Sequence, residues 1–134
     1  MKSLSILFAD DEEDIRNIVR HWLEAEGHRM AGAGSAREAK ALMAQQTFDL
    51  VVTDVLMPDG DGIDLIRETR RLQPATPILA VSGGGRYFET DDCLKVAVGL
   101  GAQAAVTKPF ARAQFLAGVA AALAPVRSDA SAAG

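Results

Sequence analysis

Five chemically active side chains of this sequence stand at the ends of short apolar runs. Asp10 and Asp11 follow "LSILFA", Asp54 follows "FDLVVT", Ser82 ends "PILAVS", and Lys108 follows "QAAVT". Carboxylates can bind a divalent cation or attack an electrophile, a hydroxyl can donate a hydrogen bond, and an ammonium can neutralise an anion. If the fold brings these side chains together, they predict a site for a cation and an anionic ligand.

Each of these residues also has a purely structural explanation. The acids of "DDEED" can stabilise the start of a helix, and Asp54 before "MPDGDG" can shape a turn. Ser82 can be a loop residue before three glycines, and Lys108 a solvated cation. Their joint occurrence at the ends of successive apolar runs favours one common site.

The apolar runs alternate with longer stretches of helical periodicity, which predicts one α/β domain over residues 1–124. Nearly continuous apolar character in "FDLVVT" predicts a strand buried on both faces of a sheet. Ser35 and Glu38 form a capping box at the start of a helix. Strands are predicted at 4–9, 29–33, 48–53, 77–82 and 103–107, and helices up to Gly27, from Ser35, from Asp61 to before Pro74, near 91–99 and over 110–123.

Alternating strands and helices predict a parallel sheet covered by helices on both faces. Ligands of such sheets bind beyond the carboxyl ends of the strands. The five side chains at the ends of the apolar runs are therefore expected at one edge of the sheet.

Composition excludes several classes of function. The chain has 134 residues with 14 basic and 18 acidic side chains, a net charge of −4 without a basic stripe, so we expect no DNA partner. No apolar run is long enough for a membrane span. One cysteine, Cys93, cannot form an internal disulfide, which fits a reducing cytoplasm. The small and polar residues 125–134 predict a disordered tail.

Four motifs resemble the receiver domain of two-component response regulators. They are "LFADDEEDIR", "DLVVTDVLMPDGDGIDLI", "ILAVSG" and "GAQAAVTKPF", and the resemblance extends from about residue 4 to 123. It implies a doubly wound, flavodoxin-like sheet of five parallel strands in the order 2-1-3-4-5, in a regulator of the stand-alone, single-domain type. It also implies a phosphoacceptor signalling domain with self-phosphorylation and self-dephosphorylation chemistry rather than an enzyme.

The resemblance implies a magnesium site at the carboxyl ends of the strands. Asp11 and Asp54 would ligate Mg²⁺ directly, Asp10 mostly through water, and Leu56 through its backbone carbonyl. In that strand order the first and third strands are neighbours about 5 Å apart. Two carboxylates at that distance repel by about 3 kcal/mol at an effective dielectric near 20, and a divalent cation removes this repulsion.

The resemblance makes Asp54 the phosphoryl acceptor. Lys108 would neutralise the phosphoryl oxygens, and the Ser82 hydroxyl would donate a hydrogen bond to them. The backbone N–H groups of Val55, Leu56 and Gly83 would supply the remaining hydrogen bonds. The peptide bond between Lys108 and Pro109 is expected to be cis.

The expected partners follow from the same resemblance. The phosphoryl donor would be a histidine kinase or a histidine phosphotransfer protein, and a separate, unknown protein would receive the signal. A monomer or a weak dimer is expected, with contacts through the face formed by the helix near 91–99, the strand 103–107 and the helix 110–123.

Two features depart from the family pattern. Ala105 stands where the family usually has a Tyr or Phe, so the usual rotation of an aromatic ring is lost. The glycine-rich loop after Ser82 is a few residues longer than is common, and we hypothesise that phosphorylation orders it and that Tyr87 or Phe88 replaces the ring. The alternative is that both aromatic rings only pack the loop against the domain. Leu56 and Gly84 cannot orient a hydrolytic water, which predicts slow self-dephosphorylation.

Three other functions compete with a phosphorylated receiver. A phosphohydrolase of the haloacid dehalogenase type needs a second Asp two residues after the nucleophile, where Leu56 stands. A nucleotide- or flavin-binding module needs a glycine- or hydroxyl-rich loop after the first strand, where "DDEED" would repel phosphate. A receiver-like module that binds partners without phosphorylation fits the motifs better than either, and Ala105 favours it.

Overall fold

The computed structural model describes residues 3–55, 57, 62–82, 98–99 and 101–124. Within them, five parallel strands form one sheet in the order β2-β1-β3-β4-β5. The strands are β1 (Ser5–Ala9), β2 (Arg29–Ala33), β3 (Leu50–Asp54), β4 (Ile78–Ser82) and β5 (Ala104–Thr107). The helices are α1 (Glu13–Ala25), α2 (Ala36–Gln45), α3 (Gly62–Leu72) and α5 (Arg112–Leu123).

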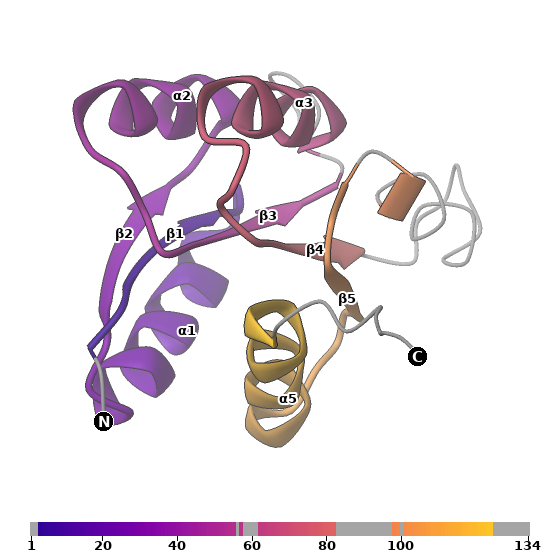
Figure 1. Cartoon of the computed structure of the whole chain (residues 1–134). Helices are drawn as coiled ribbons and strands as arrows, with labels where there is room; N and C mark the ends of the chain where they lie inside the picture. The colour runs from indigo at the N-terminus through magenta and orange to yellow at the C-terminus, as the bar shows by residue number, and fades with distance from the viewer. Residues whose placement is uncertain (1–2, 56, 58–61, 83–97, 100, 125–134) are drawn as a thin grey trace, which may run out of the picture.

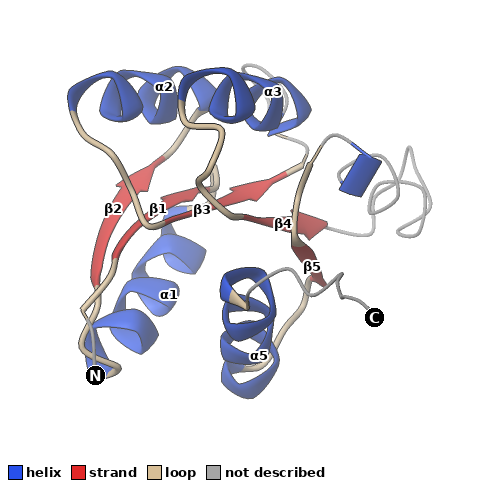
Figure 2. Cartoon of the chain, viewed as in Figure 1, coloured by secondary structure: helices blue, strands red, loops and turns tan. Residues whose placement is uncertain are grey.

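The helices cover the two faces of the sheet in pairs. Figure 1 shows α2 and α3 on one face and α1 and α5 on the other, and Figure 2 shows the sheet between these layers. Alternation along the strands divides the core accordingly: Leu7 and Ala9 of β1 pack toward α2 and α3, whereas Ile6 and Phe8 pack toward α1 and α5. This confirms the predicted doubly wound α/β fold and its strand order.

The central strands β3 and β4 are buried along their whole length, as the continuous apolar run predicts. β3 ends at Asp54, one residue beyond the predicted end, so the aspartate is the last residue of the strand. It aligns with Val81 of β4. Its backbone is therefore fixed by the sheet rather than by the loop that follows.

Local signals in the sequence explain where two helices begin and end. The Ser35 hydroxyl accepts a hydrogen bond from the Glu38 N–H at 3.1 Å and begins α2. The Glu38 carboxylate completes the cap on the Gly34 N–H rather than on that of Ser35. Gly27 has a φ of 89° and follows the end of α1, a backbone conformation that favours glycine.

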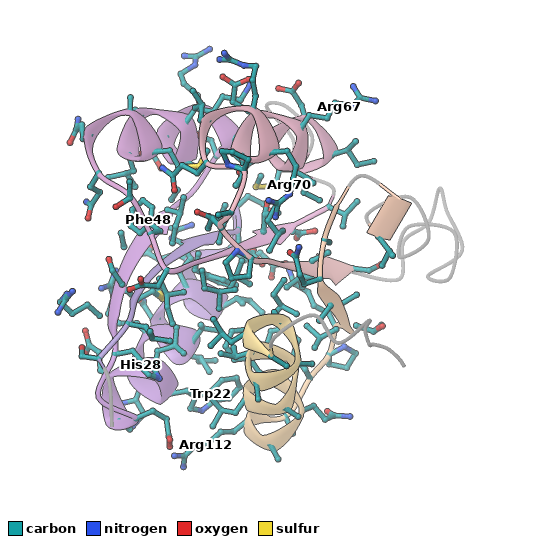
Figure 3. The ribbon with its side chains drawn as sticks, in the orientation of Figure 1. Trp22, His28, Phe48, Arg67, Arg70 and Arg112 are labelled. Atoms are coloured by element: carbon teal, nitrogen blue, oxygen red, sulfur yellow. The ribbon has the colours of Figure 1, made fainter. Side chains whose placement is uncertain are left out.

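Aromatic rings join α1 to α5 on one face of the sheet. The ring of Trp22 lies 6.0 Å from that of Phe115 and 6.1 Å from that of Phe110, and Figure 3 shows Trp22 between the two helices. Phe110 is two residues beyond Lys108, so this cluster also anchors the segment after β5. Such packing holds the segment that carries Lys108 close to the edge of the sheet.

Some predicted features lie outside the described residues. The helix expected near 91–99 is described only at 98–99, and neither the glycine-rich loop with Tyr87 and Phe88 nor the tail 125–134 is described. Among the helices that the structure does describe, none combines the length and apolarity that crossing a membrane requires.

Candidate functional site

The acids after β1 form the first part of the site. The Asp10 N–H donates to the Ala33 carbonyl of β2 at 3.0 Å, which extends the sheet by one residue. The Asp10 side chain is fully buried, whereas Asp11 and Glu12 are exposed. Carboxylate oxygens of these three residues all lie within 4.8 Å of one another. Negative charge is therefore concentrated in the turn between β1 and α1.

The Asp10 carboxylate also shapes the turn into α1. Its Oδ1 accepts a hydrogen bond from the Glu12 N–H at 2.9 Å. Glu12 is the residue at the start of α1 and makes no cap with its own side chain. The structural explanation for the acids is thus partly correct, because Asp10 supports the helix start with Oδ1 while its Oδ2 lies 2.7 Å from Lys108 Nζ. We use the name acidic pocket for Asp10, Asp11, Glu12 and Asp54 with Lys108.

Asp54 contributes a second buried carboxylate from the neighbouring strand. Only 5% of the residue is exposed. β1 and β3 are paired up to Ala9 and Thr53, so Asp10 and Asp54 come next on adjacent strands. Figure 1 shows these strands side by side in the middle of the sheet. The predicted neighbourhood of the two acids is confirmed.

Lys108 brings an ammonium to both carboxylates from β5. Its Nζ lies 2.7 Å from Asp10 Oδ2, 3.0 Å from Asp54 Oδ2 and 3.4 Å from Glu12 Oε2. Only 12% of its side chain is exposed. Its backbone N–H donates to the Ser82 carbonyl at 2.7 Å. The lysine thus spans from the edge strand to the acids, as its length predicts.

Burial and charge act in opposite directions on Lys108. Burial alone would lower the pKa of its ammonium, but hydrogen bonds and charges from Asp10 and Asp54 raise this pKa above its usual value. The ammonium is therefore protonated throughout the physiological range of pH. It provides a fixed positive charge within the acidic pocket.

Ser82 is buried at the end of β4, where it pairs with Thr107 of β5. Its position places it between Asp54 and Lys108 in the order of the strands. Leu56 and Gly83, predicted as a metal ligand and as backbone donors, lie outside the described residues. The peptide bond between Lys108 and Pro109 is cis, as the resemblance implies.

One predicted backbone donor needs correction. The Val55 N–H donates to the Val81 carbonyl at 2.8 Å and continues the pairing of β3 with β4. A single N–H already used by the sheet is not available to a phosphoryl group in this arrangement. Hydrogen bonding between β3 and β4 therefore continues to Val55, whereas the sequence predicted that the strand ends at residue 53.

Two residues that matter for the site escaped the sequence analysis. Gly62 begins α3 directly against the end of β3: a Cβ at this position would lie 1.7 Å from the Asp54 carbonyl oxygen. Its N–H donates to the Val55 carbonyl at 2.8 Å. Arg16 of α1 donates to the Asp10 carbonyl at 2.7 Å. The second glycine of "DGDG" was the available signal for the close approach, whereas no local pattern marked the arginine.

The donor set fits a hard divalent cation. Asp10, Asp11, Glu12 and Asp54 offer only oxygen atoms, and Mg²⁺ prefers such ligands while retaining several waters. Lys108 Nζ pairs with three of these carboxylates, those of Asp10, Glu12 and Asp54, and Asp11 adds a fourth beside them, so among the described residues the acids outnumber the ammonium. A cation at this place would relieve that repulsion.

Ala105 occupies the position of the missing aromatic ring. It lies in the middle of β5, aligned with Ala80, and is partly buried against the core under α2 and α3. The methyl group has no rotamers to exchange. The structure therefore places no switchable ring at this point of β5.

A doubly wound parallel sheet with acids and a lysine at the carboxyl ends of its strands defines a class of α/β proteins whose ligands bind at that edge. Within this class, the chain belongs to the response regulator receiver domain family, whose model matches residues 6–120. Receiver domains are the signalling domains of two-component response regulators, and the comparisons confirm the predicted family.

Curated relatives include response regulators much longer than this chain. Response regulator protein PilR of Pseudomonas aeruginosa is 33% identical over 109 residues, which are 81% of this chain and 24% of PilR. Response regulator SaeR of Staphylococcus aureus is 31% identical over 105 residues, 78% of this chain and 44% of SaeR. The chain thus spans less than half of either relative.

Solved receiver structures share the fold over nearly their whole length. Chemotaxis protein CheY4 of Vibrio cholerae matches with a TM-score of 0.81 and 27% identity, covering 91% of this chain and 100% of CheY4. The beryllofluoride-activated NtrC4 receiver domain dimer matches with a TM-score of 0.76 and 31% identity, covering 88% of this chain and 95% of that one.

Proposed function

We propose that this chain is a phosphorylation-dependent signalling switch whose phosphoryl acceptor is Asp54. The observation that supports this most strongly is the placement of the Lys108 ammonium within 3.0 Å of Asp54 Oδ2. An ammonium in this position lowers the charge repulsion between a carboxylate and an incoming phosphoryl group. Phosphoryl transfer depends mainly on positioning and charge neutralisation, so no general base is required.

In the proposed reaction an Asp54 carboxylate oxygen attacks the phosphorus of a phosphohistidine. A phosphorus–oxygen bond forms while the phosphorus–nitrogen bond breaks, and the electron pair of that bond returns to the ring nitrogen. The other nitrogen of the phosphohistidine ring carries a proton, so neutral imidazole leaves. The product is an acyl phosphate on Asp54. Lys108 exchanges part of its pairing with the carboxylates for the new phosphoryl oxygens, and the Ser82 hydroxyl donates a hydrogen bond to one of them.

The same pocket is proposed to hold Mg²⁺. Asp11 and Asp54, Asp10 through water, and the Leu56 carbonyl would be its ligands. When bound, the cation would neutralise charge on the phosphoryl oxygens. The carboxylates that hold the cation would place its charge next to Asp54, the acceptor. Gly62 lets α3 pack directly against the backbone of Asp54, because a Cβ would not fit there.

The donor is proposed to be a histidine kinase or a histidine phosphotransfer protein, and the output a contact with a separate protein. Similarity to response regulators supports this. We further propose a cytoplasmic protein without a DNA partner, monomeric or weakly dimeric through the face that includes β5 and α5. Slow self-dephosphorylation, from Leu56 and Gly84, is part of the proposal.

Beryllofluoride, a stable analogue of the phosphoryl group, tests the site. Amide spectra of the wild type are recorded during titration with beryllofluoride and Mg²⁺ and compared with those of Asp54→Asn. We expect large, saturable changes around Asp54, Ser82 and Lys108 in the wild type only. A wild type that does not respond, or a mutant that responds equally, would favour the alternative of a receiver-like binding module, which Ala105 supports.

A further inference from the structure

Every polar group of Asp10 is held by a different part of the chain. Its N–H donates to the Ala33 carbonyl, and its Oδ1 accepts from the Glu12 N–H. Its Oδ2 pairs with Lys108 at 2.7 Å. The remaining group, the carbonyl oxygen, accepts a hydrogen bond from Arg16 Nη1 at 2.7 Å. The contacts from Glu12 and Arg16 lie outside the proposed phosphoryl chemistry and the strand pairing, and the one from Arg16 is made by a side chain six residues away.

The Arg16 contact reaches backward from α1 across the turn that carries the acids. The two residues are six positions apart, so the guanidinium closes a loop that contains Asp11 and Glu12. Arg16 is partly buried. The turn is therefore fastened by a cationic side chain whose hydrogen bond ends on the backbone of the acidic segment.

The end of β2 leaves room for this side chain. At Gly34 a Cβ would lie only 3.2 Å from Arg16 Nη1. One helical turn further along, Arg20 makes the same kind of contact: its Nη1 donates to the Met30 carbonyl at 2.7 Å, and a Cβ on Gly32 would lie 3.3 Å from its Nη2. Arg16 and Arg20 thus fasten different segments, the acidic turn and β2, and Arg20 Nη1 also lies 3.9 Å from the exposed Glu24 carboxylate.

We propose that Arg16 is a positioning residue for the acidic pocket: its hydrogen bond to the Asp10 carbonyl holds the turn 10–12 in the conformation that binds the divalent cation. The inference rests on the proposed function for the identity of the ligand, Mg²⁺. Its physical basis is that three like charges on consecutive residues favour a more open turn. The charged hydrogen bond opposes this opening before any cation arrives.

The experiment compares Arg16→Ala, Arg16→Lys and the matched control Arg20→Ala in the full chain. The first measurement is hydrogen exchange of the Glu12 amide without metal, since this N–H donates to Asp10 Oδ1. The second is the Mg²⁺ dissociation constant by calorimetry. Thermal unfolding of each variant shows how much stability is lost, so that a general loosening of the fold can be recognised.

We expect Arg16→Ala to speed exchange of the Glu12 amide and to weaken Mg²⁺ binding by about 10-fold, the usual effect of losing a residue that orients metal ligands. Arg16→Lys, which keeps one charged donor, should restore part of both. Arg20→Ala should lose comparable stability with no change in either measurement. If Arg16→Ala does not fold, amide exchange and Mg²⁺ affinity are compared between Arg16→Lys and Arg20→Ala, and a change in Arg16→Lys only would support the proposal.

Unchanged Mg²⁺ affinity in both Arg16 variants would overturn the proposal, as would an equal loss in Arg20→Ala. A wild type that binds no Mg²⁺ would contradict the proposed function instead. In that case hydrogen exchange of the Glu12 amide alone tests the role of Arg16. Faster exchange in the Arg16 variants only would support the claim that Arg16 holds the turn 10–12, and unchanged exchange would reject that claim.

Discussion

The Lys108 ammonium lies 3.0 Å from Oδ2 of Asp54, although the two residues are 54 positions apart in the chain. They come from strands that do not touch, because β4 lies between β3 and β5. Only a long side chain can make this contact across an intervening strand. Since the same nitrogen also pairs with the buried Asp10, Lys108 balances much of the charge that the pocket has without a cation.

Replacing Lys108 by Met should destabilise the metal-free protein. The substitution leaves two buried carboxylates next to each other without their ammonium, which we expect to cost about 3 kcal/mol in the free energy of unfolding at pH 7. Urea unfolding measures this. Lys40→Met is the matched control, because Lys40 pairs with Asp64 on a more exposed surface and should cost less than about 1 kcal/mol. Equal losses in both variants would contradict the account.

The titration of Lys108 should be displaced upward. Its carboxylate partners raise the pKa of the ammonium above the ordinary 10.5. The pairing therefore stabilises the fold fully below 10.5 and loses this contribution as the pH rises through the higher, folded pKa. The side-chain resonances of Lys108 in the metal-free protein, followed against pH, give the pKa directly. Asp10→Asn should lower it, and an ordinary value in the wild type would refute the pairing.

Gly62→Ala should disturb the acceptor through the backbone. A Cβ at 1.7 Å from the Asp54 carbonyl oxygen forces α3 away from β3. We expect a loss of at least about 1–3 kcal/mol in the free energy of unfolding, the usual cost of overpacking. Gly99→Ala is the control, because nothing lies within 4 Å of a Cβ there, and it should change stability by less than about 0.5 kcal/mol. Similar stabilities of the two variants would show that α3 can shift freely.

Magnesium should stabilise the wild type and fail to stabilise Asp11→Asn. A ligand that binds only the folded state adds about 2.7 kcal/mol at 100 times its dissociation constant. Asp11 is exposed, so its substitution should cost little stability by itself. Thermal unfolding with Mg²⁺ or with a chelator measures the difference. Asp14→Asn, an exposed acid on α1, should keep the full response, and a full response in Asp11→Asn would remove Asp11 from the site.

The sequence predicted which side chains meet at the edge of the sheet where strand geometry alone decides their placement. Asp10 and Asp54 were recognisable because parallel strands bring their carboxyl ends to one edge of the sheet. The family resemblance supplied the strand order, from which the need for a long arm at Lys108 followed. The capping box at Ser35 was likewise a local pattern, and the structure differs only in which N–H the Glu38 carboxylate accepts.

Contacts between a side chain and a distant backbone could not be predicted in this way. The bond from Arg16 to the Asp10 carbonyl depends on how α1 is rotated above the sheet, which hydrophobic periodicity gives only approximately. The close approach of Gly62 depends on the path of the loop before α3. The use of the Val55 N–H by β4 depends on where pairing stops, and strand ends are the least certain part of a sequence prediction.

Intact mass spectrometry shows whether Asp54 accepts a phosphoryl group. The wild type, Asp54→Asn and the control Asp14→Asn are incubated with acetyl phosphate, in Mg²⁺ and in a chelator. We predict that the wild type and Asp14→Asn gain the mass of one phosphoryl group in Mg²⁺, and that Asp54→Asn does not. A wild type that never gains this mass, or an Asp54→Asn variant that gains it equally, would contradict the account.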